Sequence, residues 1–160
     1  MNTTALQALI DTQVAYQAEL KKISQGSFKD FFSTWLAENP KIEFVRWHQY
    51  TPHFNDGDPC KFSVSDLYFA LVDRETIPDH DGEESSGERG DGFFTHFELS
   101  AQEKSDWCKV PRPAIVATEP LDELADTMND LYDALKISFG DGVQVTVSRE
   151  EIVIDYYDHD

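Results

Sequence analysis

Carboxylates dominate the side chains that could do chemistry in this sequence, and the most regular of them lie within residues 118–139. Asp122, Asp126 and Asp130 recur every four residues, so a helix would stack them along one stripe with about 6 Å between successive charges. One strand of B-form DNA presents a phosphate about every 3.4 Å. The stripe therefore matches roughly every second phosphate, which favours an anionic surface that resembles a nucleic-acid strand. The alternative is an ordinary solvated helix face.

Acidic residues elsewhere in the C-terminal half would extend this surface. Residues 1–78 hold ten acidic and seven basic residues, whereas residues 79–160 hold 21 acidic and six basic residues, a net charge of −15. Solubility alone does not require such segregation, and self-repulsion within one region destabilises a fold. The sequence therefore predicts a partner-binding surface made of Asp122, Asp126, Asp130, Asp133, Glu150, Glu151, Asp155 and Asp158.

A second group of candidates lies in the turn-forming segment 47–60. Asn55, Asp56 and Asp58 offer oxygen ligands of the kind that calcium prefers, but the segment lacks the later Glu of an EF-hand loop. Asn, Asp, Gly and Pro are also the residues of any tight turn, so a structural turn is the favoured interpretation. A contact site for a partner is the alternative, and its candidate residues are Trp47, Tyr50, Phe54, Asn55, Asp56 and Asp58, although the three aromatic residues would serve equally well in a core.

No pattern in the chain predicts a catalytic centre or a cofactor. The sequence has no GxSxG, no phosphate-binding loop and no GxGxxG motif. A metal-dependent phosphoesterase would need carboxylates such as those that crowd the C-terminus, but a frayed acidic tail explains them more simply. Residues of the types that bind zinc are present without the spacing of a zinc site, namely His53, Cys60, His96 and Cys108. We therefore expect neither a metal site nor catalytic residues.

Length and charge narrow the class of protein further. The chain has 160 residues, which fits one domain spanning 1–160, and its 31 acidic and 13 basic residues give a net charge of −18. Such a charge argues against direct binding to nucleic acid or to an anionic membrane, and it favours a basic partner. No signal peptide or membrane-spanning run is apparent, and Cys60 and Cys108 form no CxxC pair. We expect a reduced, cytoplasmic setting.

Apolar spacing predicts helices at the N-terminus and again after residue 118. Residues 1–38 favour two helices, one that ends near Gly26 and one that begins at Ser27. Within the second, Phe31, Phe32 and Trp35 would belong to the core or to an interface between two copies of the chain. The late helix, residues 118–139, ends at a Gly-Asp-Gly turn and carries an apolar seam of Leu121, Leu124, Met128, Leu131 and Leu135.

The remaining pattern is that of an antiparallel sheet. Residues 41–50, 62–72 and 93–99 are rich in β-formers, and residues 143–147 and 152–156 alternate as the two strands of a hairpin. Residues 79–92 contain no apolar residue, so we expect a mobile acidic loop there. The predicted fold class is α+β, with N-terminal helices, an antiparallel sheet of about four to five strands, and one late amphipathic helix followed by a C-terminal hairpin.

One segment of the central region resembles known sequences. The run RWHQYTP, which continues into FNDGDPC and then Phe62-Ser63-Val64, is similar to a segment of uncharacterised small proteins of phages and prophages. The resemblance covers about twenty of the 160 residues and carries no activity and no catalytic residues. It implies a phage or prophage origin, and compact acidic proteins that disarm host enzymes are a familiar type there.

Charge layout and resemblance together predict a non-enzymatic inhibitor that acts by nucleic-acid mimicry. Its anionic C-terminal surface would occupy the groove of a basic, nucleic-acid-binding host protein in the host cytoplasm. Two alternatives stay open. The first is a small accessory or virion protein that acts through segment 47–60, and the second is a metal-dependent enzyme. Dimerisation through an apolar face is compatible with each of them.

Overall fold

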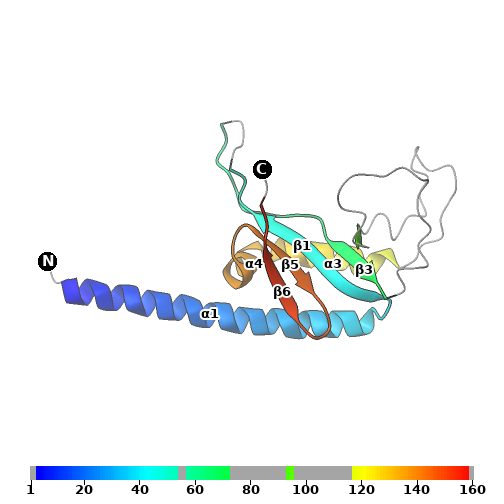
Figure 1. Cartoon of the computed structure of the whole chain (residues 1–160), viewed down its shortest axis with the longest axis horizontal. Helices are drawn as coiled ribbons and strands as arrows, with labels where there is room; N and C mark the ends of the chain where they lie inside the picture. Colours follow the sequence, from blue (N-terminus) through cyan, green and yellow to red (C-terminus); the bar gives the residue numbers. More distant parts are fainter. Residues whose placement is uncertain (1–2, 54–56, 73–92, 96–116, 159–160) are drawn as a thin grey trace.

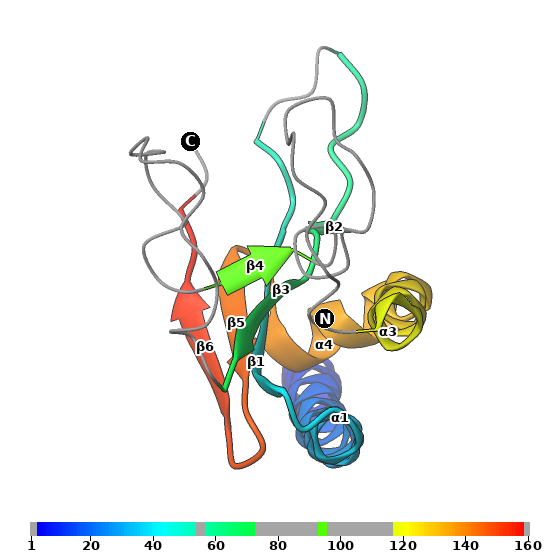
Figure 2. The same ribbon diagram turned by 90° about the vertical axis from the view of Figure 1, so that its right-hand side faces the viewer.

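The computed structural model describes residues 3–53, 57–72, 93–95 and 117–158 (Figure 1). The fold is α+β, with one antiparallel sheet whose helices lie along one of its faces (Figure 2). This arrangement confirms the predicted fold class. The acidic segment 79–92 and residues 96–99 of the predicted third strand lie outside the described residues.

The N-terminal region is a single helix, α1 (Thr3–Glu38), so the prediction of two helices is wrong. Gly26 has no positive φ, and it continues the helix. The hydroxyl of Ser27 donates to the carbonyl of Ile23 at 3.1 Å, so it does not cap a new helix. Phe28 and Phe32, two and six residues after Gly26, are buried. Their burial stabilises the continuous helix by more than the roughly 1 kcal/mol that a glycine costs within it.

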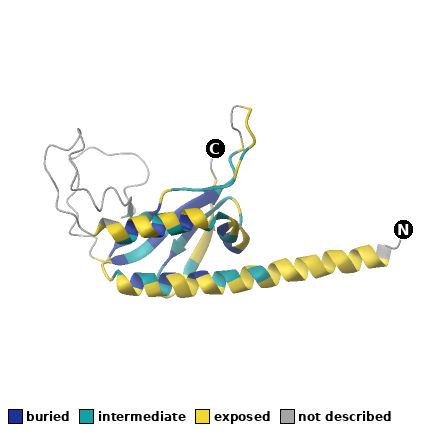
Figure 3. Cartoon of the chain, turned by 180° about the vertical axis from the view of Figure 1, so that it is seen from behind, coloured by how far each residue is buried: buried dark blue, intermediate teal, exposed yellow. Residues whose placement is uncertain are grey.

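Within the described residues, the C-terminal half of α1 is the part of this helix that packs on the rest of the fold. The ring of Phe28 lies 5.3 Å from that of Phe139, and Phe32 stacks on Trp47 with 5.5 Å between ring centroids. The side-chain amide of Gln25 donates to the carbonyl of Ser138 at 2.7 Å. The N-terminal half projects away from the body and is exposed along its length (Figures 1 and 3).

The sheet is built around β1 (Ile42–Tyr50). The strand order is β4-β3-β1-β5-β6, every pairing is antiparallel, and the short β2 pairs with the end of β1. The predicted strand 62–72 is thus two shorter strands on the same side of β1. The C-terminal hairpin is confirmed, and it pairs Val143 with Tyr156 and Val147 with Ile152. The other strands are β2 (Ser63–Val64), β3 (Tyr68–Leu71), β4 (Phe93–Thr95), β5 (Val143–Val147) and β6 (Ile152–Tyr156).

Alternation along β1 separates the core from the opposite face of the sheet. Val45, Trp47 and Gln49 have no exposed surface, and they point toward the helices. Arg46 and His48 point to the opposite face, where each contacts a residue of β5. The central strand of the sheet therefore contributes both to the core and to a polar, aromatic outer face.

The late helical region is broken into α3 (Thr118–Asp130) and α4 (Tyr132–Phe139), so the prediction of one continuous helix is also wrong. At Leu131 the backbone has φ −107° and ψ 18°, and its N–H donates to the carbonyl of Met128, three residues back. This tighter turn redirects the chain, and α4 packs against α1. The predicted seam is nevertheless in the core: Leu121, Leu124, Met128 and Leu135 are buried and Leu131 is partly buried.

Candidate functional site

The exposed side of α3 forms an acidic face. Its carboxylates lie opposite the buried side chains of Leu121, Leu124 and Met128, which are at most 2% exposed. Because these three side chains are packed in the core, the helix cannot roll to bury its charged side. The helix contains no basic residue. We call this surface the α3 acidic face, and it consists of Glu119, Asp122, Glu123, Asp126 and Asp130, all exposed.

The geometry of this face is unfavourable for the helix itself. Asp122, Asp126 and Asp130 are spaced four residues apart, and like charges at that spacing repel. Glu119 lies in the first turn, where the helix dipole favours an acid, but Asp130 ends a helix whose last turn has no basic residue. The α3 acidic face thus destabilises the helix that carries it.

The other predicted acidic residues do not join this face into one surface. Asp133 is exposed in the first turn of α4. Glu150 and Glu151 lie in the turn between β5 and β6, and Asp155 and Asp158 lie on and just after β6. Figure 2 shows α3 and β6 on opposite sides of the fold. The predicted residues therefore form two separate groups, one on the helices and one on the C-terminal hairpin.

Of the two roles left open for Trp47, the structure places it in the core. The side chain has no exposed surface, and its ring stacks on Phe32 and meets the edge of Phe139 with 5.7 Å between centroids. Such a side chain cannot belong to a contact surface of this fold. Tyr50 is half-buried, with its ring 5.7 Å from that of Tyr157, and Asp58 is exposed. The remaining candidates of segment 47–60, Phe54, Asn55 and Asp56, lie outside the described residues.

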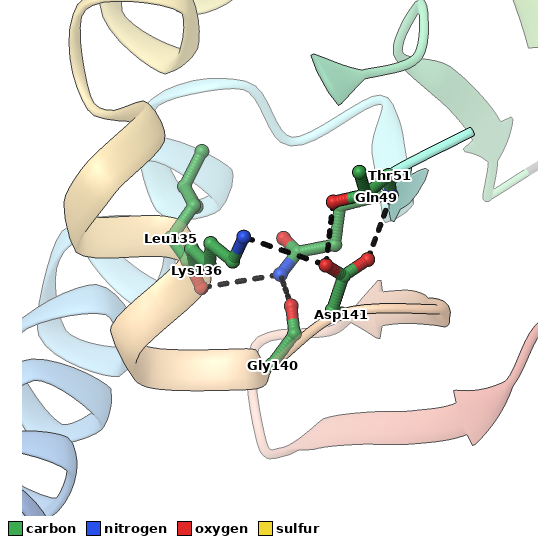
Figure 4. Close-up of polar contacts among 6 residues, drawn as sticks. All are labelled: Gln49, Thr51, Leu135, Lys136, Gly140 and Asp141. Atoms are coloured by element: carbon green, nitrogen blue, oxygen red, sulfur yellow. Dashed lines mark hydrogen bonds and ion pairs between the residues drawn. The ribbon is translucent and has the colours of Figure 1, made fainter. Parts of the chain in front are cut away.

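Gln49 is a buried polar residue that the sequence analysis did not single out. Its side-chain oxygen accepts a hydrogen bond from the indole N–H of Trp47 at 3.0 Å. Its amide nitrogen donates to the carbonyls of Leu135 and Gly140, at 3.2 and 2.5 Å (Figure 4). Gln49 therefore joins the C-terminal end of β1 to the C-terminal end of α4. The sequence did contain a signal for the burial of Gln49, because residues 45, 47 and 49 lie on the same face of a strand.

Asp141 holds the point where the chain leaves β1. Its carboxylate accepts hydrogen bonds from the Thr51 backbone N–H at 2.7 Å and from the Thr51 hydroxyl at 2.6 Å, and it lies 3.4 Å from the Lys136 ammonium (Figure 4). Partial burial acts to raise the pKa of this carboxyl, but the hydrogen bonds from Thr51 and the charge of Lys136 together hold the pKa below its ordinary value. Asp141, in the Gly140–Gly142 turn after α4, thus fixes the position of Thr51 in segment 47–60.

Replacing Asp141 by asparagine is expected to destabilise the protein by roughly 1 kcal/mol at neutral pH, a figure already reduced for solvent screening. Because the folded pKa lies below the unfolded one, the contribution of Asp141 is present above the unfolded value and is lost as pH falls through the folded pKa. Urea unfolding of both proteins at pH 7 and pH 3 measures this. The stability difference should shrink at pH 3, and a constant difference would contradict the assignment.

A polar and aromatic cluster occupies the outer face of the sheet, and it too was missed. The guanidinium of Arg46 lies 3.6 Å from the centroid of the Phe93 ring, and its Nε donates to the hydroxyl of Thr146 at 3.1 Å. The imidazole of His48 stacks on Tyr157 at 4.1 Å, and its Nε2 is 3.0 Å from the side-chain oxygen of Gln144. These contacts join β1 to β4, to β5 and to the segment after β6, so we interpret the cluster as part of the sheet structure.

The described residues contain neither a metal-binding cluster nor a helix that could cross a membrane. In the parts of the chain that the structure describes, no group of three or more His, Cys, Asp and Glu side chains is close enough to hold a metal ion. Of the zinc-ligand types, His53 and Cys60 lie in the described ranges, whereas His96 and Cys108 lie outside them. No helix within the described residues has the length and apolar character needed to cross a membrane.

Fold and site together define an α+β protein that displays a base-free acidic helix. Comparisons of the chain with protein-family models, with curated proteins and with solved structures find no match.

Proposed function

We propose that this protein is a non-enzymatic inhibitor that presents the α3 acidic face to the groove of a basic, nucleic-acid-binding protein. The observation that carries the proposal is a helix with five exposed carboxylates and no basic residue, held in place by a buried seam of Leu121, Leu124 and Met128. Such a face repels phosphates and attracts the Lys and Arg side chains that would otherwise contact them. A phage origin and a site of action in the host cytoplasm belong to the same proposal.

The positions of the two acidic groups determine which of them can make the contact. The acidic group on the hairpin lies on the opposite side of the fold from α3 (Figure 2), so one groove cannot accept both groups. The proposed contact is therefore the α3 acidic face together with Asp133. The hairpin group, Glu150, Glu151, Asp155 and Asp158, adds to the long-range field and hence to the rate of association.

The test compares two double variants that remove the same charge at different places. Asp126→Asn with Asp130→Asn removes both like-charge pairs of the α3 acidic face that are spaced four residues apart, Asp122–Asp126 and Asp126–Asp130. Glu150→Gln with Glu151→Gln removes two charges from the hairpin turn. A partner is first captured from a host lysate, eluted with salt, identified and purified. Its affinity for each variant is then measured at several salt concentrations.

The α3 variant should bind more weakly and with a shallower salt dependence than the hairpin variant. It should also be more stable, by about 0.4–1 kcal/mol, because the two repelling pairs each destabilise the helix by roughly 0.2–0.5 kcal/mol. Gain of stability with loss of binding is the signature of a surface kept for contact. Equal weakening in the two variants would implicate net charge alone, and an affinity that does not change with salt would overturn the proposal.

A further inference from the structure

The projecting half of α1 carries an apolar stripe that the rest of the described fold leaves uncovered. Leu6, Leu9, Tyr16 and Ile23 are 58%, 68%, 65% and 58% exposed. Most of the stability of a helix in a protein comes from packing of its apolar face, and an exposed apolar stripe commonly marks a contact surface. We call it the α1 stripe, and its members follow one another by steps of three and four: Leu6, Leu9, Gln13, Tyr16, Leu20 and Ile23.

We propose that a second copy of the chain covers the α1 stripe, with the two helices antiparallel. Steps of three and four are the spacing with which two helices interlock side chains along a shared seam. In the antiparallel register that pairs residues whose numbers sum to 29, Leu6 faces Ile23, and Leu9 faces Leu20. Gln13 faces Tyr16 at the centre, where a polar pair would set the register. Two-fold symmetry repeats each of these layers.

The charge distribution favours this occupant and this direction. Residues 3–23 contain two acidic residues, Asp11 and Glu19, and two basic residues, Lys21 and Lys22, so their net charge is zero in a chain of −18. Two copies can therefore approach along this helix with little repulsion. Antiparallel pairing places the two acidic bodies at opposite ends of a pair about 30 Å long. That separation is several times the Debye length of about 8 Å, whereas parallel pairing would bring the bodies together.

A groove beside the stripe would extend the contact onto the body. It is lined by α1 residues, among them Tyr16, Gln17 and Leu20, and by Ile137 of α4, which is 48% exposed. In the proposed register the partner's Leu9 lies at Leu20, with its Ile10 on the flank. The partner helix would therefore bury Ile137 as well as the stripe. The inference does not depend on the proposed function, because the α1 stripe and the α3 acidic face share no residue.

The test is the mass of the full chain in solution, measured by sedimentation equilibrium. The wild type should associate from 18.3 kDa to twice that mass, with a dissociation constant in roughly the micromolar range. Leu9→Glu alone and Leu20→Lys alone should each be monomeric. The double variant should associate again, because the antiparallel register places each Glu at position 9 against a Lys at position 20. Parallel pairing would instead place like charges together.

Ala15→Glu is the matched control for Leu9→Glu. It also adds one negative charge to α1, but at an exposed position away from the α1 stripe. It should associate like the wild type. A wild type that stays monomeric up to about 0.1 mM would overturn the proposed dimer. A wild-type dimer that the double variant fails to restore would overturn the antiparallel register.

Discussion

Replacing Trp47 by alanine is expected to lower the free energy of unfolding by about 3–5 kcal/mol. The ring is fully buried between Phe32 and Phe139, so its removal leaves a cavity at the contact of β1 with α1 and α4. The change also removes the indole N–H that donates to Gln49, which leaves a buried oxygen without its donor. Urea unfolding at neutral pH, followed by circular dichroism, measures the loss.

The matched control for Trp47 is Phe31→Ala. Phe31 is 38% exposed, although its ring lies 5.2 Å from that of Phe32. Its truncation should therefore reduce stability by only about 1 kcal/mol. A Trp47→Ala protein as stable as the Phe31→Ala protein would contradict the core assignment and would restore Trp47 as a candidate contact residue.

Replacing Gln49 by leucine is expected to lower the free energy of unfolding by about 2–4 kcal/mol. Leucine has a similar volume, so little of the loss can come from a cavity. The loss comes instead from the Trp47 N–H and from the carbonyls of Leu135 and Gly140, which keep their burial but lose the Gln49 amide. The same unfolding experiment measures it, and hydrogen exchange in α4 should accelerate because its C-terminal end is released.

Gln144→Leu provides the comparison for Gln49. Gln144 is half-buried on the outer face of the sheet, where its side-chain oxygen contacts His48. Losing that contact should reduce stability by about 1 kcal/mol or less. Equal losses for the two glutamine variants would show that the Gln49 network contributes no more than an ordinary hydrogen bond at the edge of the core.

The structure weakens the case for segment 47–60 as a contact site, and it leaves the case for the α3 acidic face in place. Trp47 is in the core, and Thr51 is held by Asp141, so the first residues of the segment have structural roles. The α3 acidic face, in contrast, is exposed as the spacing of Asp122, Asp126 and Asp130 predicts. A contact role for the segment would now rest on Tyr50, Asp58 and residues outside the described ranges.

Local patterns were sufficient where the period of an element determines which of its side chains share a face. The alternation of residues 143–147 and 152–156 determined the hairpin, and the three-four spacing of Leu121, Leu124, Met128 and Leu135 determined which side of α3 and α4 enters the core. The same spacing placed the acidic residues of α3 on the exposed side. These features follow from the sequence because the period of an element fixes which side chains share a face.

The tertiary structure decided what depends on contacts between distant segments. The helix continues through the stop signal at Gly26 because the burial of Phe28 and Phe32 against α4 and β1 stabilises the fold by more than a glycine within the helix costs. The break at Leu131 and the buried amide of Gln49 likewise depend on how α4 meets the sheet. The acidic residues that the structure describes in the C-terminal half divide into two surfaces for the same reason. The sequence shows how many charges this half carries, but the packing of α3 and β6 on opposite sides of the fold decides which of the described charges share a face.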